Sequence, residues 1–300
     1  MAAPAELAAT ADRLGVPGYA RDAQRRTCLP AELPFFNDPR RTEHLARASL
    51  EPILETLPAR CRVADLGGAD GYVARAFRDY LAGRGIGVEA VVVDANPESL
   101  RVAQKHGLSV VPGNLETVRL RGINIAIIRL VMQYNSLAAQ KRILMRAFEC
   151  LVPRGVLILQ AETGTLPSVL FRNLLSRFLQ HVQGADSPAL NGRWVSTRGL
   201  ARLVGASGFS SPRVSEDFLV FETQLEDLLR LAWTRFYGTP TSTEESRRRF
   251  DAFRAYANTL ATRLLERGVA ADLTAAAGTI VFSSRHALIV ATKLDSRRDS

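Results

Sequence analysis

The sequence predicts an α/β protein built on a doubly wound, mostly parallel β-sheet. From residue 62 onward, short runs rich in Val, Ile and Leu alternate with stretches of helical periodicity. One of these runs ends in a turn of small residues, Gly67 to Gly71, directly before a helical stretch. The chain has 300 residues, 47% of them hydrophobic, which is enough for one large core and a smaller accessory lobe.

The first part of the sheet is predicted between residues 62 and 161. Short apolar runs bounded by turn residues predict strands, and apolar residues that recur every three or four positions predict helices. Most of the predicted strands are followed by a helix, which is the connection that parallel strands require. The strands are 62–66, 87–94, 109–111, 123–130 and 155–161, and the helices are 71–83, 98–105 and 138–151.

Further helices and two strands are predicted in the second half of the chain. A strand is expected at 211–220, and a long helix at about 244–266 begins with a capping box, Thr241-x-x-Glu244. The apolar stripe of this helix is expected to pack in a core rather than against a ligand. The last strand, 279–290, is expected to contain a turn near Ser283-Ser284-Arg285.

Helical segments outside the sheet pattern are predicted to form a lid and a cap. The N-terminal residues are amphipathic and end in a helix from about Arg41 to Thr56, and a helix at 167–183 interrupts the strands. The predicted units are an N-terminal helical lid or arm (1–57), a core (58–221 and 277–295) with a helical insertion (164–193), and a helical cap (222–276).

Charge and cysteine content narrow the class of protein. The formal net charge is +9, but the basic residues are mostly dispersed Arg with one compact run at 247–249, so a nucleic-acid partner stays open without being favoured. Cys28, Cys61 and Cys150 lie too far apart for a disulfide framework or a zinc site, and no metal site is predicted. Neither a membrane span nor a secretory signal is evident, so we expect a cytoplasmic protein without a membrane partner.

The most informative segment runs from Val63 to Tyr72, where a strand, a glycine-rich turn and a helix follow one another. Such a turn lets the backbone approach a ligand closely, although a tight strand-to-helix turn is its commoner meaning. The next strand ends in Asp94, whose carboxylate could accept hydrogen bonds from both hydroxyls of a ribose. A dinucleotide-binding GxGxxG motif would need glycine where this chain has Ala69 and Tyr72, so a nicotinamide cofactor is not favoured.

These segments resemble, in order, the motifs of the class I S-adenosylmethionine-dependent methyltransferases. The run Asp65-x-Gly67-Gly68-Ala69-Asp70-Gly71 is similar to motif I, and Asp94 matches the acid that ends the second strand of the family. The run Pro112-Gly113-Asn114-Leu115-Glu116 falls where the family binds adenine. The resemblance covers about residues 60–162 and extends to 194–209. It implies a Rossmann-like, seven-stranded, mostly parallel sheet with an antiparallel last strand.

The resemblance implies S-adenosylmethionine as the cofactor and gives the matching residues their roles. Asp94 would hold the ribose, Asn114 would accept a hydrogen bond from the adenine amino group, and Leu115 would lie against the ring. Asp65 would act near the amino-acid end of the cofactor, although an acid in this position could also cap the turn or pair with a cation. The implied cofactor-binding residues are Asp65, Gly67, Gly68, Gly71, Asp94, Ala95, Asn114, Leu115 and Arg129.

The chain departs from the family pattern at three positions. Ala69 replaces the central glycine, and Asn114 and Asn124 replace acids. Ala69 should be tolerated if its backbone is not left-handed. These departures keep open the interpretation that the chain is a non-catalytic, cofactor-binding member of the fold.

No catalytic residue is identified by its spacing. The four histidines have neither metal-ligand nor triad spacing, and a structural role is favoured for each. His44, His181 and Tyr134 are the candidates for catalysis, because their segments could border a substrate pocket. Gln133 and Tyr134 could orient a substrate or cover the methionine end of the cofactor. Methyl transfer from a sulfonium depends largely on positioning, and a base is needed only if the acceptor does not shed its proton unaided.

The resemblance and the composition of the helical segments predict a small-molecule methyltransferase. We expect transfer to an O or N atom of a small, partly apolar molecule, as in natural-product pathways. The alternatives are an RNA or protein methyltransferase and the non-catalytic binder, and the cap could also serve a homodimer. The aromatic residues that suggest a closed cavity are Phe35, Phe36, Phe171, Trp194, Trp233, Phe236 and Tyr237.

Overall fold

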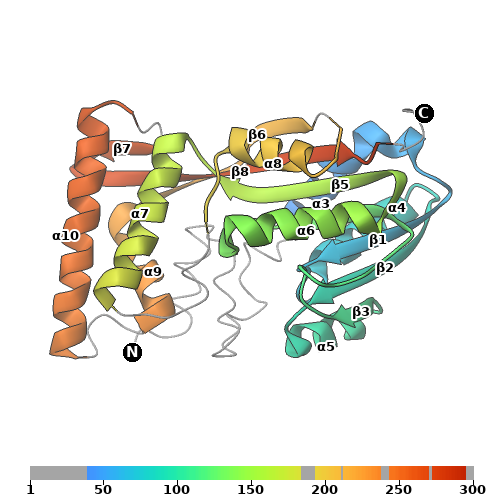
Figure 1. The fold of residues 1–300 in the computed structure, drawn as a ribbon, viewed down its shortest axis with the longest axis horizontal. Helices are drawn as coiled ribbons and strands as arrows, with labels where there is room; N and C mark the ends of the chain where they lie inside the picture. Colours follow the sequence, from blue (N-terminus) through green and yellow to red (C-terminus); the bar gives the residue numbers. More distant parts are fainter. Residues whose placement is uncertain (1–38, 184–192, 211, 238–242, 270–271, 295–300) are drawn as a thin grey trace.

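The computed structural model describes residues 39–183, 193–210, 212–237, 243–269 and 272–294. Its strands form one sheet in the order β3-β2-β1-β4-β5-β8-β6, and a short strand, β7, pairs with β8 (Figure 1). From β3 to β5 neighbouring strands are parallel, whereas β8 is antiparallel to both β5 and β6. The strands are β1 (Arg60–Leu66), β2 (Gly87–Asp94), β3 (Ser109–Pro112), β4 (Ile123–Arg129), β5 (Leu151–Thr163), β6 (Arg213–Gln224), β7 (Leu273–Ala276) and β8 (Thr279–Thr292).

This arrangement confirms the predicted fold class, a doubly wound and mostly parallel sheet with an antiparallel last strand. β7 is an additional short strand that was not predicted separately. The prediction of a turn near Ser283 is wrong, because β8 is unbroken. Residues 283–285 pair with Glu222, Phe221 and Val220 of β6, and these cross-strand bonds give their backbone groups the partners that a turn would have left to solvent.

Helices cover both faces of the sheet. The predicted helix at 41–56 ends as an α-helix at Leu50 and continues as a 3-10 turn, because Pro52 has no N–H to donate to the preceding turn. The capping box is also wrong in register: the side chain of Thr243 accepts the Ser246 N–H at 3.0 Å, and Thr241 lies outside the described residues. The helices are α3 (Pro39–Leu50), α4 (Tyr72–Ala82), α5 (Pro97–Lys105), α6 (Leu137–Cys150), α7 (Leu166–Gln183), α8 (Thr197–Ala206), α9 (Leu225–Tyr237) and α10 (Glu244–Glu266), with 3-10 turns η1 (Glu51–Thr56) and η2 (Met132–Tyr134).

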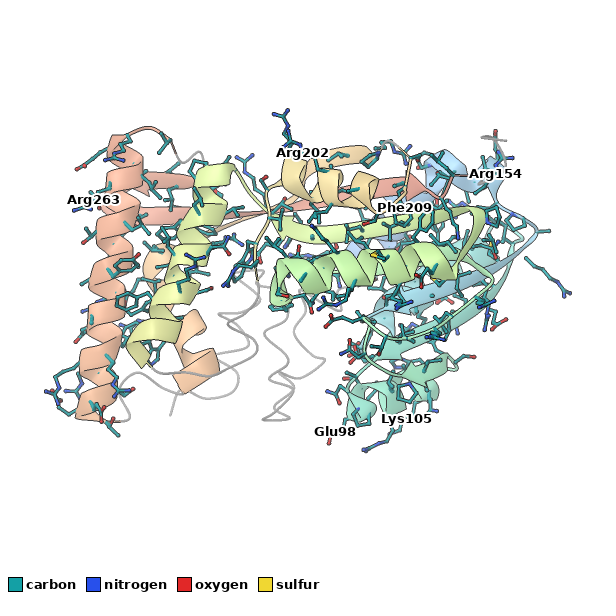
Figure 2. The ribbon with its side chains drawn as sticks, in the orientation of Figure 1. Glu98, Lys105, Arg154, Arg202, Phe209 and Arg263 are labelled. Atoms are coloured by element: carbon teal, nitrogen blue, oxygen red, sulfur yellow. The ribbon has the colours of Figure 1, made fainter. Side chains whose placement is uncertain are left out.

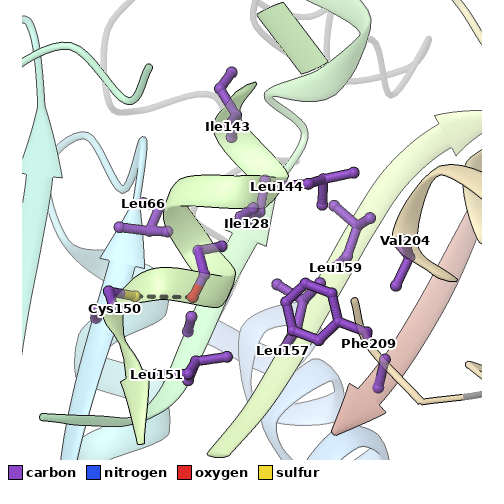
Figure 3. Close-up of a cluster of buried hydrophobic side chains, with 14 of the residues drawn as sticks. Leu66, Ile128, Ile143, Leu144, Cys150, Leu151, Leu157, Leu159, Val204 and Phe209 are labelled. Carbon is purple, nitrogen blue, oxygen red and sulfur yellow. Dashed lines mark hydrogen bonds between the residues drawn. The ribbon is translucent and has the colours of Figure 1, made fainter. Parts of the chain in front are cut away.

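The main core has two layers because alternate residues of each strand face opposite sides of the sheet. In β4, Ala126 and Ile128 pack on one face with residues of α6 and α8, such as Leu144 and Val204 (Figure 3). The intervening residues, including Ile127, pack on the other face with α3 and α4. Since both faces are covered, the central strands are continuous apolar runs, as buried parallel strands generally are.

A second apolar cluster forms a separate lobe, called the α7/α9/α10 lobe below. It packs these three helices with β7 and the beginning of β8, and it lies at the end of the molecule remote from β1, β2 and β3 (Figure 1). Phe250, Phe253 and Ala257 of α10 are buried in it, which confirms that the stripe of this helix packs in a core. Phe171 and Trp233, expected to line a cavity, are also buried here. No helix in the described ranges combines the length and apolar content needed to cross a membrane.

Candidate functional site

The glycine-rich turn lies at the carboxyl end of β1 and is bonded to the end of β2. The N–H groups of Gly67 and Gly68 both donate to the carbonyl oxygen of Val93, at 2.7 and 3.3 Å. The Ala69 N–H donates to Oδ2 of Asp94 at 3.0 Å. Three consecutive backbone N–H groups of the turn therefore have partners within the protein.

Packing requires glycine at three positions of this turn. Gly67 and Gly71 have φ values of 83° and 79°, in the left-handed region that favours glycine. The space left by each missing side chain is filled by another residue of the protein, which supports the interpretation of the glycines as a tight strand-to-helix turn. A Cβ would lie 2.6 Å from Cγ2 of Val131 at Gly67, 2.3 Å from Cγ of Asp65 at Gly68, and 2.3 Å from Cδ1 of Leu108 at Gly71.

Ala69, at the centre of the turn, is left-handed, with φ at 56°. The condition under which the sequence analysis expected alanine to be tolerated is therefore not met. A residue with a Cβ is destabilised by about 1–2 kcal/mol in this conformation. The bond from Ala69 to Asp94 and the bonds of the two preceding glycines hold the chain there, so the turn keeps a strained residue beside a buried acid.

Asp94 is buried at the end of β2, with 7% of its surface exposed. Its Oδ1 accepts the Asn96 N–H at 2.8 Å and its Oδ2 accepts the Ala69 N–H, so the carboxylate joins the glycine turn to the start of α5. A carboxylate has about four acceptor positions, and an aspartate oriented in this way can also accept hydrogen bonds from ligand hydroxyls. Ala95, which follows it, is exposed.

Asp65 lies beneath the turn and is 1% exposed. Its Oδ2 accepts the Ala74 N–H at 3.2 Å, so it caps the N-terminal turn of α4, whose own N-cap residue, Gly71, has no side chain. Burial raises the pKa of Asp65 to about 7, against the opposing effects of the Ala74 bond and of Arg129. Burial also lowers the pKa of Arg129 to about 10, and Asp65 opposes this shift. The capping role considered for Asp65 is therefore observed, and a cation lies near it.

The chain turns sharply where β4 ends. Leu130 has a left-handed backbone, with φ at 56°, and its N–H donates to the Gln160 carbonyl of β5 at 2.8 Å. The bend brings Val131 against Gly67 of the glycine turn. η2 follows, and it contains Gln133 and Tyr134 at the same edge of the sheet.

A buried polar cluster continues along this edge on β5 and β8. Glu162 forms an ion pair with Arg172 of α7, both side chains being almost fully buried, and accepts the Trp194 Nε1–H at 3.4 Å. His286 is the cross-strand neighbour of Glu162. Burial lowers the pKa of His286 to about 4, against the opposing effect of Glu162. This cluster was not predicted from the sequence, although the polar residues at alternate positions, Gln160 and Glu162, at the end of a predicted buried strand are a signal for it.

The two residues expected at the adenine lie near the turn but differ in environment. Leu115 is partly buried, and its Cδ1 would lie 3.3 Å from a Cβ at Gly67. Asn114 is exposed, and its Oδ1 accepts the Glu116 N–H at 2.8 Å. Asn124 lies at the opposite end of the sheet, where its Oδ1 accepts the Arg62 N–H at 2.8 Å, so it has a structural role.

The three catalytic candidates belong to three different elements. His44 is exposed on α3, Tyr134 ends η2, and His181 belongs to α7 with its side chain outside the described part. In the described ranges, no group of three His, Cys, Asp or Glu residues could hold a metal ion.

The strand order, with parallel neighbours from β3 to β5 and an antiparallel β8, is that of a Rossmann-like α/β fold, and two solved structures share this fold. The chain is similar to the YcgJ protein from Bacillus subtilis, with a TM-score of 0.56 and 19% identity over 83% of this chain and 100% of that one. It is also similar to a proposed methyltransferase from Bacillus halodurans C-125, with a TM-score of 0.57 and 16% identity over the same shares, 83% and 100%. No family model and no curated protein matches the chain. The resemblance predicted from the motifs is confirmed at the level of the fold.

Proposed function

We propose that the chain binds S-adenosylmethionine at the carboxyl edge of β1, β2 and β4 and transfers its methyl group to a small molecule. The observation that carries the proposal is the hydrogen bond from the Ala69 N–H to Asp94 Oδ2. It joins the glycine turn to a buried acid at the point where this fold binds ligands. When bound, the cofactor would supply an activated methyl group together with its leaving group.

The hydrogen bonds of the turn favour this cofactor over a dinucleotide. Glycine turns that bind phosphate present their backbone N–H groups to the anion. Here the N–H groups of Gly67, Gly68 and Ala69 donate within the protein, and the Gly71 N–H donates to the Gly68 carbonyl at 2.9 Å. S-adenosylmethionine has no phosphate, so a turn whose N–H groups are already used suits it.

The neighbouring side chains would then hold the nucleoside. Asp94 would accept hydrogen bonds from the ribose hydroxyls, and Leu115 would lie against the adenine. The Oδ1 of Asn114 would accept a hydrogen bond from the adenine amino group. It already accepts one from the Glu116 N–H, and a carbonyl oxygen has two lone pairs, so both bonds can form. Asp65 would position the turn through its bond to α4.

The order of the strands indicates where the methyl acceptor would bind. If adenine lies by the loop after β3 and ribose by Asp94 on β2, the methionine end lies toward β1 and β4. The acceptor would then approach from the side of β5 and the α7/α9/α10 lobe (Figure 1). A site bounded by a separate lobe suits a small molecule, and we propose an O or N acceptor of the kind found in natural products.

An RNA or protein substrate would call for a continuous basic surface beside the cofactor. Instead, basic side chains project from separate elements, such as Lys105 on α5, Arg202 on α8 and Arg263 on α10 (Figure 2). Arg247, in the one compact basic run, pairs with Glu244 at 3.1 Å. A small-molecule substrate is therefore the proposal that we favour.

The test combines binding with turnover. Calorimetric titration with S-adenosylmethionine and S-adenosylhomocysteine should show binding of both. In a separate assay with S-adenosylmethionine, release of newly formed S-adenosylhomocysteine should be detected when a panel of phenols, alcohols and amines is added. Absence of binding would refute the proposal. Binding without release across the panel would favour the non-catalytic binder.

A further inference from the structure

Gln133 carries a buried side-chain amide at the carboxyl edge of the sheet. The residue lies in η2 and is 2% exposed. Neither its Oε1 nor its Nε2 has a hydrogen-bond partner among the described residues. Buried side-chain amides are normally satisfied, and an unsatisfied one destabilises the folded protein, so its presence calls for an explanation.

The backbone around Gln133 is held by other amides. Asn135 Nδ2 donates to the Val131 carbonyl at 2.8 Å, and Gln140 Nε2 donates to the carbonyls of Met132 and Asn135 at 2.9 and 3.0 Å. These bonds fix η2 without the side chain of Gln133. A structural role therefore does not account for this residue.

The position of Gln133 relates it to the acceptor rather than to the nucleoside. It lies two residues after Val131, which contacts the glycine turn, and η2 also contacts β5. The nucleoside is proposed to lie on the opposite side of the turn, over β2 and β3. On the proposed function, on which this step rests, Gln133 is therefore near the transferable methyl group.

The chemistry at this edge favours a neutral ligand group. Glu162 is neutralised by its ion pair with Arg172, and the Arg129 guanidinium lies near Asp65 and bonds the Gln160 side chain. The buried amide atoms without a hydrogen-bond partner among the described residues include both of Gln133, Oε1 of Gln140, and Nε2 of Gln160, whose Oε1 accepts the Arg129 Nε–H at 2.9 Å. An amide both donates and accepts, so it matches a hydroxyl group, which does the same, better than a carboxylate or an ammonium.

We propose that Gln133 forms the polar end of the acceptor subsite and binds an uncharged hydroxyl group of the methyl-accepting molecule. It is a specificity-determining residue that selects hydroxyl-bearing molecules over their charged or apolar analogues. A buried site built to bond a hydroxyl discriminates strongly against an analogue that lacks it, because the amide is then left unsatisfied.

The test compares Gln133→Leu with the control Gln104→Leu, a change of the same chemistry at an exposed position of α5. Phenol is the probe, with toluene and benzoate as its apolar and charged analogues, and binding is measured by ligand-observed NMR with S-adenosylhomocysteine present. In the wild type and the control, phenol should bind more tightly than either analogue. In Gln133→Leu, phenol should bind about tenfold more weakly, about 1.4 kcal/mol, with toluene unchanged.

Two further measurements separate the possible failures. Gln133→Leu should keep its affinity for S-adenosylhomocysteine within about twofold and should unfold at the same temperature as the wild type or higher, because it removes an unsatisfied amide. A lower unfolding temperature would show that the amide is structural, and loss of S-adenosylhomocysteine binding would assign it to the cofactor. Phenol binding that does not exceed that of toluene, or that Gln133→Leu leaves unchanged, would also overturn the proposal. If the wild type does not bind S-adenosylhomocysteine, the proposed function fails, and this proposal with it.

Discussion

Replacing Asp94 by asparagine tests how much the hydrogen bonds between Asp94 and the backbone of the glycine turn and of Asn96 stabilise the fold. The carboxylate accepts two backbone N–H groups, at 3.0 and 2.8 Å from its two oxygens. Asparagine keeps one acceptor oxygen and turns an NH2 group toward the other N–H. Losing one hydrogen bond to a charged group is worth about 1.5–3 kcal/mol. We expect the free energy of unfolding to fall by about 2 kcal/mol and the melting temperature to fall by about 3 °C, because a chain of 300 residues has a large unfolding entropy.

The same substitution should weaken the cofactor site. If Asp94 bonds the ribose, the affinity of the folded variant for S-adenosylhomocysteine should fall by about 10-fold to 100-fold, measured by calorimetric titration below the melting temperature. Glu89→Gln is the matched control: it makes the same change at the other end of β2, where the side chain is exposed and bonds Arg62 at 2.8 Å. This control should leave affinity and stability nearly unchanged. An Asp94→Asn variant that binds like the wild type would refute the assignment.

Three further predictions concern the strained and buried groups of this edge. Ala69→Gly should raise the free energy of unfolding in urea by up to about 1 kcal/mol, because relief of left-handed strain outweighs the greater freedom of glycine in the unfolded chain; a clear fall would contradict the strain argument. The pKa of Asp65 is about 7 in the folded protein against an ordinary value of 3.8, so the folded state binds the proton more tightly and the contribution of Asp65 to stability falls as pH rises between these values. Asp65→Asn should flatten the pH dependence of the unfolding free energy in this window, and an unchanged slope would show that Asp65 titrates normally. Arg172→Met should destabilise the protein by about 3–5 kcal/mol by leaving Glu162 buried without its cation, and adding Glu162→Gln should recover part of the loss; simple additivity of the two changes would contradict a coupled pair.

The sequence predicts those parts of the fold that local pattern determines. The continuous apolar runs and the helices between them specify the parallel strands, because a strand covered on both faces needs apolar residues throughout. The glycine turn is also a local signal, since φ values near 80° at Gly67 and Gly71 favour glycine. The stripe of α10 predicts its burial in the same way.

Tertiary contacts determine what the sequence could not predict. Residues 283–285 look like a turn, but pairing with β6 keeps them extended. The left-handed conformation of Ala69 depends on its bond to Asp94, 25 positions later in the chain. The ion pair of Glu162 with Arg172 and the unsatisfied amide of Gln133 likewise follow from how separate elements meet. The alternate polar residues of β5 indicate that Glu162 is unusual, but they do not identify its partner on α7.

Hydrogen exchange with and without S-adenosylhomocysteine tests the central claim most directly, because it reports both binding and its location. The account predicts slower amide exchange in peptides that cover the glycine turn (67–71), residues 94–96 and residues 114–116, with exchange in α10 unchanged. Protection confined to the α7/α9/α10 lobe, or no protection at a saturating concentration, would contradict a cofactor site at the carboxyl edge of β1 and β2.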